Sequence, residues 1–346
     1  MTRKHQPSIS RPLLALLTLS SALLVPACRT ADSTERQPST SVGKQPRPSR
    51  GSAAGEDFVR QARDLKSTGR DDEALALLSR AIEQNPTLTV AHLEMGDIYE
   101  RQGDFQAAEQ SFSTAAVQQP ANFDAQFGHG RALQALSRIA EAVRAYLRAL
   151  AIRPDHFEAN LNLGTAYLTL EGPAQALPYA QRAAQLNPSS GPAHANLAAV
   201  YLALARHREA VTHYESASEL MPLSPPLLLN WAETLGKLER YEEMVNVLAA
   251  AIRLQPSAPA HERTGFARFR LRQYEAATQS FSQAIQIDPQ HYPALNGLGV
   301  CRLNQYILSG KTDVGAHDDA MSAFRASLRI NQRQPRIVEL IARYER

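Results

Sequence analysis

The chain has 346 residues, of which 44% are hydrophobic, 21% charged and 6% aromatic, with a formal net charge of +3 and a pI near 8.9. This hydrophobic fraction is ordinary for a soluble protein and excludes full-length disorder or a polytopic membrane protein. Two cysteines are too few for a disulfide framework or a cysteine-rich zinc site.

The positive charge is concentrated near the N-terminus. Residues 1–54 contain eight Lys or Arg and two Asp or Glu, so residues 55–346 together have a net charge of −3. Phosphate binding needs a clustered positive face. The charge distribution therefore removes the electrostatic basis for a general nucleic-acid-binding function.

Residues 1–27 have the pattern of an export signal, with basic residues before an apolar run too short for a bilayer span of about 20 residues. The end of this run resembles the bacterial lipobox: Val25 and Ala27 fit the pattern, and Pro26 departs from it. The resemblance implies that the signal is cleaved and that Cys28 is lipidated. An ordinary signal peptide with an incidental cysteine and an uncleaved anchor are the alternatives.

Residues 28–54 are rich in Ser, Thr, Pro, Arg and Gly and show no apolar periodicity. Such a composition cannot bury a core, so we expect a disordered tether. As a flexible chain it would reach roughly 25–30 Å on average and would hold the folded part away from a membrane.

The rest of the chain repeats with a period of 34 residues. Prolines mark the period: Pro86, Pro120, Pro154, Pro188, Pro222 and Pro256 are evenly spaced, and Pro289 follows one residue early. The period defines eight units and a C-terminal cap: 55–88, 89–122, 123–156, 157–190, 191–224, 225–257, 258–291, 292–334 and 335–346. An insertion near residues 307–317 lengthens the eighth unit.

Small and large residues recur at fixed positions, counted from the first residue of each unit. Position 8 is always small: Ala62, Gly96, Gly130, Gly164, Ala198, Ala232, Gly265 and Gly299. Position 24 is usually large: Leu78, Phe112, Tyr146, Tyr214, Leu248, Phe281 and Phe324, with Ala180 as the exception. The apolar spacing predicts two amphipathic helices per unit, with small residues allowing close approach and the large residue filling the gap.

This pattern resembles the tetratricopeptide repeat family over residues 55–330. The resemblance implies an all-α fold, a right-handed superhelical solenoid of about eight repeats closed by a capping helix. It also implies a concave groove lined by the first helix of each repeat, and a non-enzymatic scaffold that binds other proteins. Bacterial lipoproteins with such repeats are similar in organisation.

No catalytic, metal-binding or cofactor-binding motif is present in the sequence. The histidines are scattered, and neither HExxH nor GxSxG occurs. Cys301 lies at a core-proximal position, which favours a packed, unreactive thiol. We therefore expect no enzyme activity, no cofactor, no metal and no small-molecule substrate.

Position 6 is asparagine in three successive units: Asn162, Asn196 and Asn230. An amide side chain has both donors and an acceptor, so such a ladder could pair with the backbone of an extended peptide. It resembles the asparagine ladder in the repeats of protein O-linked N-acetylglucosamine transferases, whose transferase domain has no counterpart here. The alternative is that repeat duplication preserved three solvated asparagines.

A second candidate peptide-binding patch lies in the seventh unit, where Arg263, Phe266, Phe269 and Arg270 are predicted to face the groove. Arginine binds carboxylates through two hydrogen bonds, and the rings offer an apolar anchor. Residues 258–346 carry a net +4, which suggested an acidic segment or a C-terminus as ligand. A register shift of one residue would instead place both phenylalanines in the core.

These observations predict a lipid-anchored scaffold of the cell envelope, facing the periplasm or the exterior, that binds extended segments of other proteins in its groove. The competing prediction is an architectural or self-associating envelope component that binds no peptide. Neither prediction involves nucleic acid, and both require export.

Overall fold

The computed structural model describes residues 50–345, with side chains described from residue 55, and within this part the chain forms helices joined by short connectors. The expected signal peptide, the expected lipidation site Cys28 and most of the expected tether lie outside the described residues. Helix α1 begins at Arg50, so the last residues assigned to the tether are helical. Ala53 and Ala54 have the highest helix propensity of any residue type, which favours this extension.

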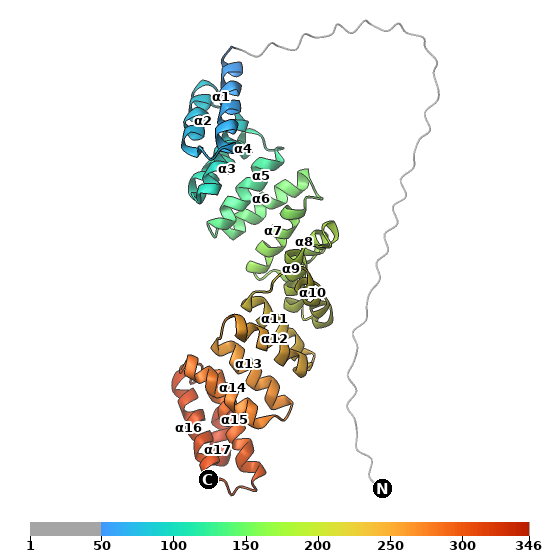
Figure 1. The fold of residues 1–346 in the computed structure, drawn as a ribbon, viewed down its shortest axis with the longest axis vertical. Coiled ribbons are helices and arrows are strands. Elements are labelled where there is room, and N and C mark those ends of the chain that lie inside the picture. The colour runs from blue at the N-terminus through green and yellow to red at the C-terminus, as the bar shows by residue number, and fades with distance from the viewer. Residues whose placement is uncertain (1–49, 346) are drawn as a thin grey trace, which may run out of the picture. The chain divides into compact units, whose positions relative to one another are not determined.

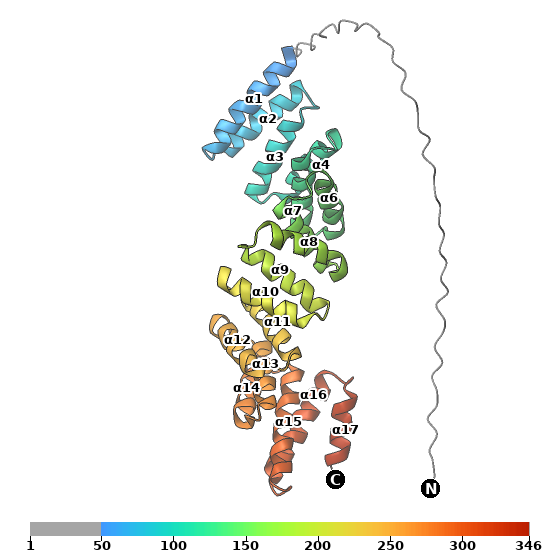
Figure 2. The same ribbon diagram turned by 90° about the vertical axis from the view of Figure 1, so that its right-hand side faces the viewer.

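The helices pair into eight antiparallel hairpins that follow one another in chain order (Figures 1 and 2). The first helices are α1 (Arg50–Ser67), α3 (Thr89–Gln102), α5 (Phe123–Ala135), α7 (Phe157–Thr169), α9 (Gly191–Ala203), α11 (Pro225–Lys237), α13 (Ala258–Arg270) and α15 (Tyr292–Leu308). The second helices are α2 (Asp71–Gln84), α4 (Phe105–Gln118), α6 (Ile139–Ile152), α8 (Pro173–Leu186), α10 (His207–Leu220), α12 (Tyr241–Leu254), α14 (Tyr274–Ile287) and α16 (Val314–Ile330). Helix α17 (Pro335–Tyr344) packs on α16 as the cap.

The insertion in the eighth unit lengthens both of its helices rather than forming a long loop. Helices α15 and α16 have 17 residues each, whereas the other second helices have 14. The connector between them is short and contains Gly310 and Lys311 in the left-handed region. The eighth hairpin is therefore the longest among the described residues.

Aromatic rings packed on glycines set the spacing of the helices. The Tyr146 ring on α6 is fully buried, and a Cβ at Gly130 on α5 would lie 2.5 Å from it. Phe112 on α4 occupies the same place against Gly96 of its own repeat and Gly128 of the next repeat. Because atoms cannot approach this closely, any side chain at these glycines would force the helices apart.

The connectors between α10 and α11 and between α12 and α13 differ from the other connectors between repeats. In five of those, the fourth residue donates its N–H to the carbonyl of the first, as Asn122 does to Gln119 at 2.9 Å. Residues 221–224 lack this bond, and Met221 is extended (φ −154°, ψ 155°). Helices α10 and α11 also pack less extensively than the other second helices and following first helices of the eight repeats.

Replacing Gly130 by alanine should destabilise the full chain, by about 1–3 kcal/mol, because the new methyl group would overlap the Tyr146 ring. The measurement is the midpoint of thermal unfolding. Gly315→Ala on α16 is the matched control, because its Cβ meets only Asp313 at an ordinary 3.6 Å and alanine favours the helix. Equal effects of the two substitutions would contradict the ring-on-glycine account.

Candidate functional site

The first helices form the inner face of the solenoid. Most first helices contact the first helix of the next repeat, as α13 contacts α15, and contacts between successive second helices are fewer within residues 50–345. The inner face is therefore made by the odd-numbered helices α1 to α15, where the sequence placed both candidate sites.

Position 6 of one repeat faces position 9 of the repeat before it. Three pairs of side chains show this directly. Arg63 Nε donates to Glu94 Oε1 at 2.6 Å, the Asn196 amide donates to the Thr165 hydroxyl, and Arg263 Nη2 lies 3.3 Å from Glu233 Oε2. Contact across the repeat boundary thus decides whether a position 6 side chain is available to a ligand.

The three asparagines of the expected ladder have three different environments. Asn162 is half-buried beside the hydroxyl of Tyr146. Asn196 is half-buried and bonded to Thr165, with its Oδ1 buried and unpartnered. Asn230 is exposed and makes no side-chain hydrogen bond with other described residues, because position 9 of the preceding repeat is Ala199. The ladder therefore offers one free amide and two that are partly engaged within the protein.

The N-terminal third of the inner face carries a continuous set of ion pairs. Glu94 accepts from Lys66 Nζ at 2.7 Å as well as from Arg63, and Lys66 also bonds Asp97 at 3.0 Å. Burial alone would raise the pKa of Glu94, but the hydrogen bonds and charges of Lys66 and Arg63 lower it overall. The charges here satisfy one another and stabilise the stacking of α1 on α3.

The patch predicted in the seventh unit is only partly free. Arg263 donates to the Leu229 carbonyl at 2.8 Å as well as pairing with Glu233. The Arg270 guanidinium lies over the Tyr241 ring, 4.9 Å from its centroid, and 3.5 Å from a Glu239 oxygen.

The two phenylalanines of this patch differ in their burial. Phe266 is 41% exposed on the inner face. Phe269 is half-buried, packs against the core around Phe281 and has its ring centroid 5.4 Å from that of Tyr274. Phe266 therefore lies at the surface of α13, whereas Phe269 contributes to the core as well as to the surface.

Two hollows meet at α13 on this face. One, of about 330 Å³, lies between α11 and α13 and includes Glu233, Lys237, Glu262 and Phe266. The other, of about 290 Å³, lies between α13 and α15 and includes Glu262, Phe266, Phe269, Asn296 and Gly297. Glu262 and Phe266 border both hollows, and they form the centre of the candidate site.

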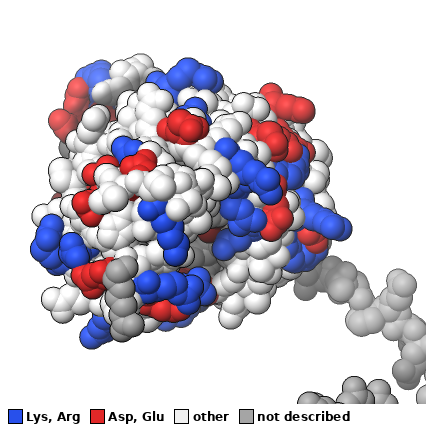
Figure 3. Space-filling view, turned by 90° about the horizontal axis from the view of Figure 1, so that it is seen from below, with Lys and Arg blue, Asp and Glu red and all other residues white. Residues whose placement is uncertain are grey.

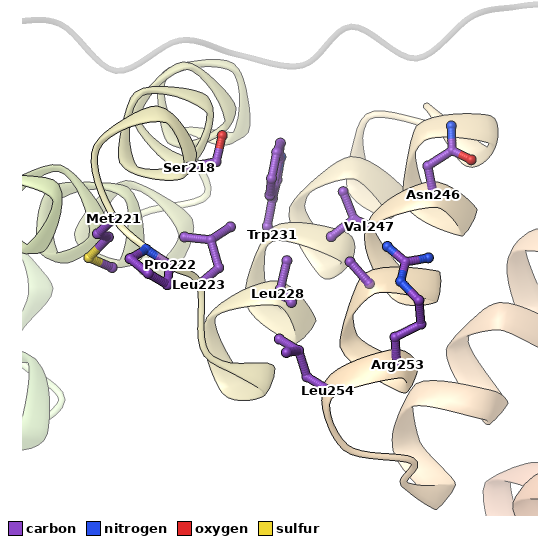
Figure 4. Close-up of a pocket in the computed structure, with 11 residues that line it drawn as sticks. Ser218, Met221, Pro222, Leu223, Leu228, Trp231, Asn246, Val247, Arg253 and Leu254 are labelled. Atoms are coloured by element: carbon purple, nitrogen blue, oxygen red, sulfur yellow. The ribbon is translucent and has the colours of Figure 1, made fainter.

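A third hollow, of about 490 Å³, lies between α10, α11 and α12 (Figure 4). The extended connector borders it with Met221 and Leu223, and the indole ring of Trp231 stands in its middle (Figure 4). The Trp231 Nε1 atom is buried with no acceptor. No residue of either predicted site lines this hollow, which opens where α10 and α11 pack least.

The structure gives no sign of metal or nucleic-acid chemistry in the part it describes. Across residues 50–345, no three His, Cys, Asp or Glu side chains gather as a potential metal site. On the face seen in Figure 3, basic and acidic side chains are interspersed. Cys301 is buried, and burial raises the pKa of its thiol to about 11, so this thiol is not activated as a nucleophile.

The helices of residues 50–345 include none with the length and apolar character that crossing a bilayer requires.

The family model for the tetratricopeptide repeat matches six overlapping segments: residues 59–123, 93–157, 127–190, 161–225, 229–292 and 264–335. Together these segments cover well over half of the chain. The chain belongs to the tetratricopeptide repeat family. Members are generally non-enzymatic scaffolds that bind other proteins or peptides, and this chain is accordingly a protein–protein interaction scaffold.

Solved structures of tetratricopeptide repeat proteins have the same fold. A repeat protein from Parabacteroides merdae is 18% identical over 72% of this chain and 99% of that chain, with a TM-score of 0.50. PilF from Pseudomonas aeruginosa is 19% identical over 60% of this chain and 94% of its own, also with a TM-score of 0.50. The Cut9–Hcn1 structure matches 84% of this chain and 58% of that chain at 16% identity, with a TM-score of 0.52. No curated protein matches the chain.

Sequence reasoning missed two residues of the tetratricopeptide repeat inner face, Glu262 and Asn296. Both occupy position 5, directly before position 6, where the expected asparagine ladder lies. Their repeat position was visible in the sequence. Their exposure to the hollow between α13 and α15 could not be read from the sequence, because this hollow depends on Gly297 at the boundary between the seventh and eighth repeats.

Replacing Glu94 by glutamine should lower the midpoint of thermal unfolding at pH 7, and the difference from the unchanged chain should become smaller as the pH falls below 4.5. The pKa of Glu94 is below its ordinary 4.5 in the folded chain, so its stabilisation is complete above that value and is lost as the pH falls through the folded pKa. Thermal melts of both chains across this range are the measurement, with exposed Glu83→Gln as control. A difference that stayed constant from pH 7 to pH 3 would contradict this assignment.

Proposed function

We propose that the chain is a membrane-tethered scaffold outside the cytoplasm that binds extended segments of other proteins on its inner face. The observation that carries the proposal is a trough on α7, α9 and α11 with few charged side chains. At the groove positions 5, 6, 9 and 12 these helices present Leu161, Asn162, Thr165, Leu168, Ala195, Asn196, Ala199, Leu202, Leu229, Asn230, Glu233 and Gly236.

The trough suits a peptide backbone better than a particular side-chain sequence. Its single charge at these positions, Glu233, is paired with Arg263. The small residues Ala195 and Ala199 leave room for an extended chain, and the exposed amide of Asn230 can donate to and accept from a backbone at once. A surface of this kind recognises the shape and backbone of a bound peptide more than its amino-acid sequence.

The membrane tether and export are supported by the sequence of residues 1–54. A basic segment, an apolar run and Cys28 follow one another in the order of a lipoprotein signal. A lipid on Cys28 would leave residues 29–49 as a spacer before α1. The scaffold would then stay close to a membrane surface while its inner face remained open to partners.

Replacing Asn230 by alanine should reduce the crosslinking of partner segments to the inner face by about fivefold or more, as at an interface residue that contributes strongly to binding. The measurement is photocrosslinking of the full chain in its native cell, with mass spectrometric mapping of the joined residues. Thermal stability should not change, because the Asn230 side chain bonds no other described residue. The triple variant N162A/N196A/N230A should capture least.

Asn246→Ala is the matched control, because Asn246 is an exposed asparagine on α12 that borders the hollow of Figure 4 instead. If N246A reduced crosslinking and N230A did not, binding would be located at that hollow. In the architectural alternative, the chain would self-associate through the same hollow. The rim of this hollow includes Leu254, whose side chain is 60% exposed. Stable oligomers in light scattering, with no segment crosslinked to the inner face, would favour that alternative.

Replacing Cys28 by serine should abolish the incorporation of labelled palmitate and release the chain from the membrane fraction. The reason is that thioether lipidation needs the cysteine sulfur, which serine lacks. Equal labelling of the wild-type chain and C28S would reject lipid anchoring and leave the groove proposal intact. Cys301→Ser is the control, because Cys301 is buried in α15.

A further inference from the structure

The hollow between α13 and α15 lies at a repeat boundary where positions 9 and 6 form no side-chain pair. Position 9 of the seventh repeat is Phe266, and position 6 of the eighth is Gly297. No side chain from Gly297 can cover Phe266, and the Phe281 ring lies 2.2 Å from where a Cβ at Gly297 would stand. The space stays open, with Phe266, Phe269 and Phe281 among its walls.

The amide of Asn296 has a fixed orientation at the wall of this hollow. Gln334 Nε2 donates to the carbonyls of Asn331 at 2.8 Å and Ser327 at 3.2 Å, so the Gln334 oxygen must face Asn296. Asn296 Nδ2 donates to that oxygen at 2.6 Å. The Asn296 Oδ1 atom is therefore the acceptor left over, and it is buried without a donor. A buried acceptor without a donor is costly, and a ligand that donates to it would remove the cost.

Glu262 adds a second acceptor to the same hollow. Its carboxylate is half-buried and makes no hydrogen bond or ion pair within residues 50–345. Two cations near this carboxylate are engaged within the protein. Arg263 bonds Leu229 and Glu233, and Arg270, which also lines the hollow, has its guanidinium over the Tyr241 ring. Lys237 borders the adjoining hollow between α11 and α13. Burial raises the pKa of Glu262, and this effect outweighs the nearby charge of Arg263. A bound cation would stabilise the charged form of this carboxylate.

We propose that the hollow between α13 and α15 binds a cationic side chain, lysine or arginine, of the segment held on the inner face. The aliphatic stem would pack on the rings of Phe266 and Phe269, and the charged end would donate to the Glu262 carboxylate and to Asn296 Oδ1. Cations are attracted to the faces of aromatic rings, which adds to the carboxylate contact. The inference rests on the proposed function and names the residue class that the groove selects.

This inference reverses the expectation drawn from the net charge of residues 258–346. That expectation assigned an acidic ligand to Arg263 and Arg270, whose donors are committed within the protein. Net charge counts all side chains of a segment equally. Recognition depends on the few groups that remain unpaired at the surface, and here these are acceptors.

The test uses the full chain and synthetic ten-residue peptides of Gly, Ser, Ala and Thr that differ at one central residue: lysine, norleucine or glutamate. Fluorescence anisotropy of labelled peptides measures affinity. The lysine peptide should bind about tenfold or more tightly than the norleucine peptide, which has a stem of similar length without charge, because a charge-assisted hydrogen bond and a cation–ring contact are both lost. The glutamate peptide should bind most weakly.

Glu262→Gln keeps the shape of the side chain and should remove most of the lysine preference. The thermal midpoint of this variant should be unchanged or higher, because a half-buried carboxylate without a partner is replaced by a neutral amide. The control is Glu242→Gln, an exposed position at the start of α12 that borders none of the three hollows. It should keep the preference.

The outcomes separate the two proposals. Peptides that bind equally whatever the central residue, or an E262Q chain that keeps the lysine preference, would overturn the cation site and leave the groove function standing. A lysine preference that depends on Glu262, together with peptide affinities that N230A leaves unchanged, would support the cation site and count against the asparagine trough. Failure of every peptide to bind would reject both.

Discussion

The structure depends on close packing between the second helices and the small residues of the first helices. In four repeats this packing sets an aromatic ring against glycine, with the rings supplied by Phe112, Tyr146, Phe281 and Phe324. Phe281 shows the full arrangement, touching Gly265 within its repeat and Gly297 across the boundary. The ring fixes the distance between helices, and that distance fixes which inner-face positions meet. The contact of position 6 with position 9 follows from it, since both lie on first helices held at this spacing. Binding properties of the inner face are therefore a consequence of core packing.

Much of the fold could be predicted from the sequence, because the period, the small residues and the large residues repeat in register. Position 8 and position 24 alone indicate paired helices and their neighbours. The extension of α1 to Arg50 could not be predicted, because the composition before residue 55 indicated a tether. The helix propensity of Ala53 and Ala54 favoured a helix, and the composition gave no way to weigh one against the other. The long α15 and α16 were equally hidden, because an insertion can lengthen helices or form a loop.

The candidate site was harder to predict, for a reason that Asn196 and Asn230 illustrate. They have the same residue type and repeat position, yet Thr165 engages one and Ala199 leaves the other free. The deciding residue lies in the preceding repeat, 31 positions earlier in each case. A comparison of each position 6 with the position 9 before it would have shown this difference in the sequence.

The connector between α10 and α11 has a consequence for the mechanics of the molecule. In a repeat array each unit is stabilised mainly by its neighbours, so resistance to bending varies along the chain with the quality of each boundary. Within residues 50–345, the boundary between the fifth and sixth repeats has the least extensive packing of a second helix on the following first helix, so we expect it to be the most compliant. A force on the two ends of the array would bend it there first. The trough of α7, α9 and α11 crosses this boundary, so bending would change the distance between Asn196 and Asn230 and strain a segment bound to both.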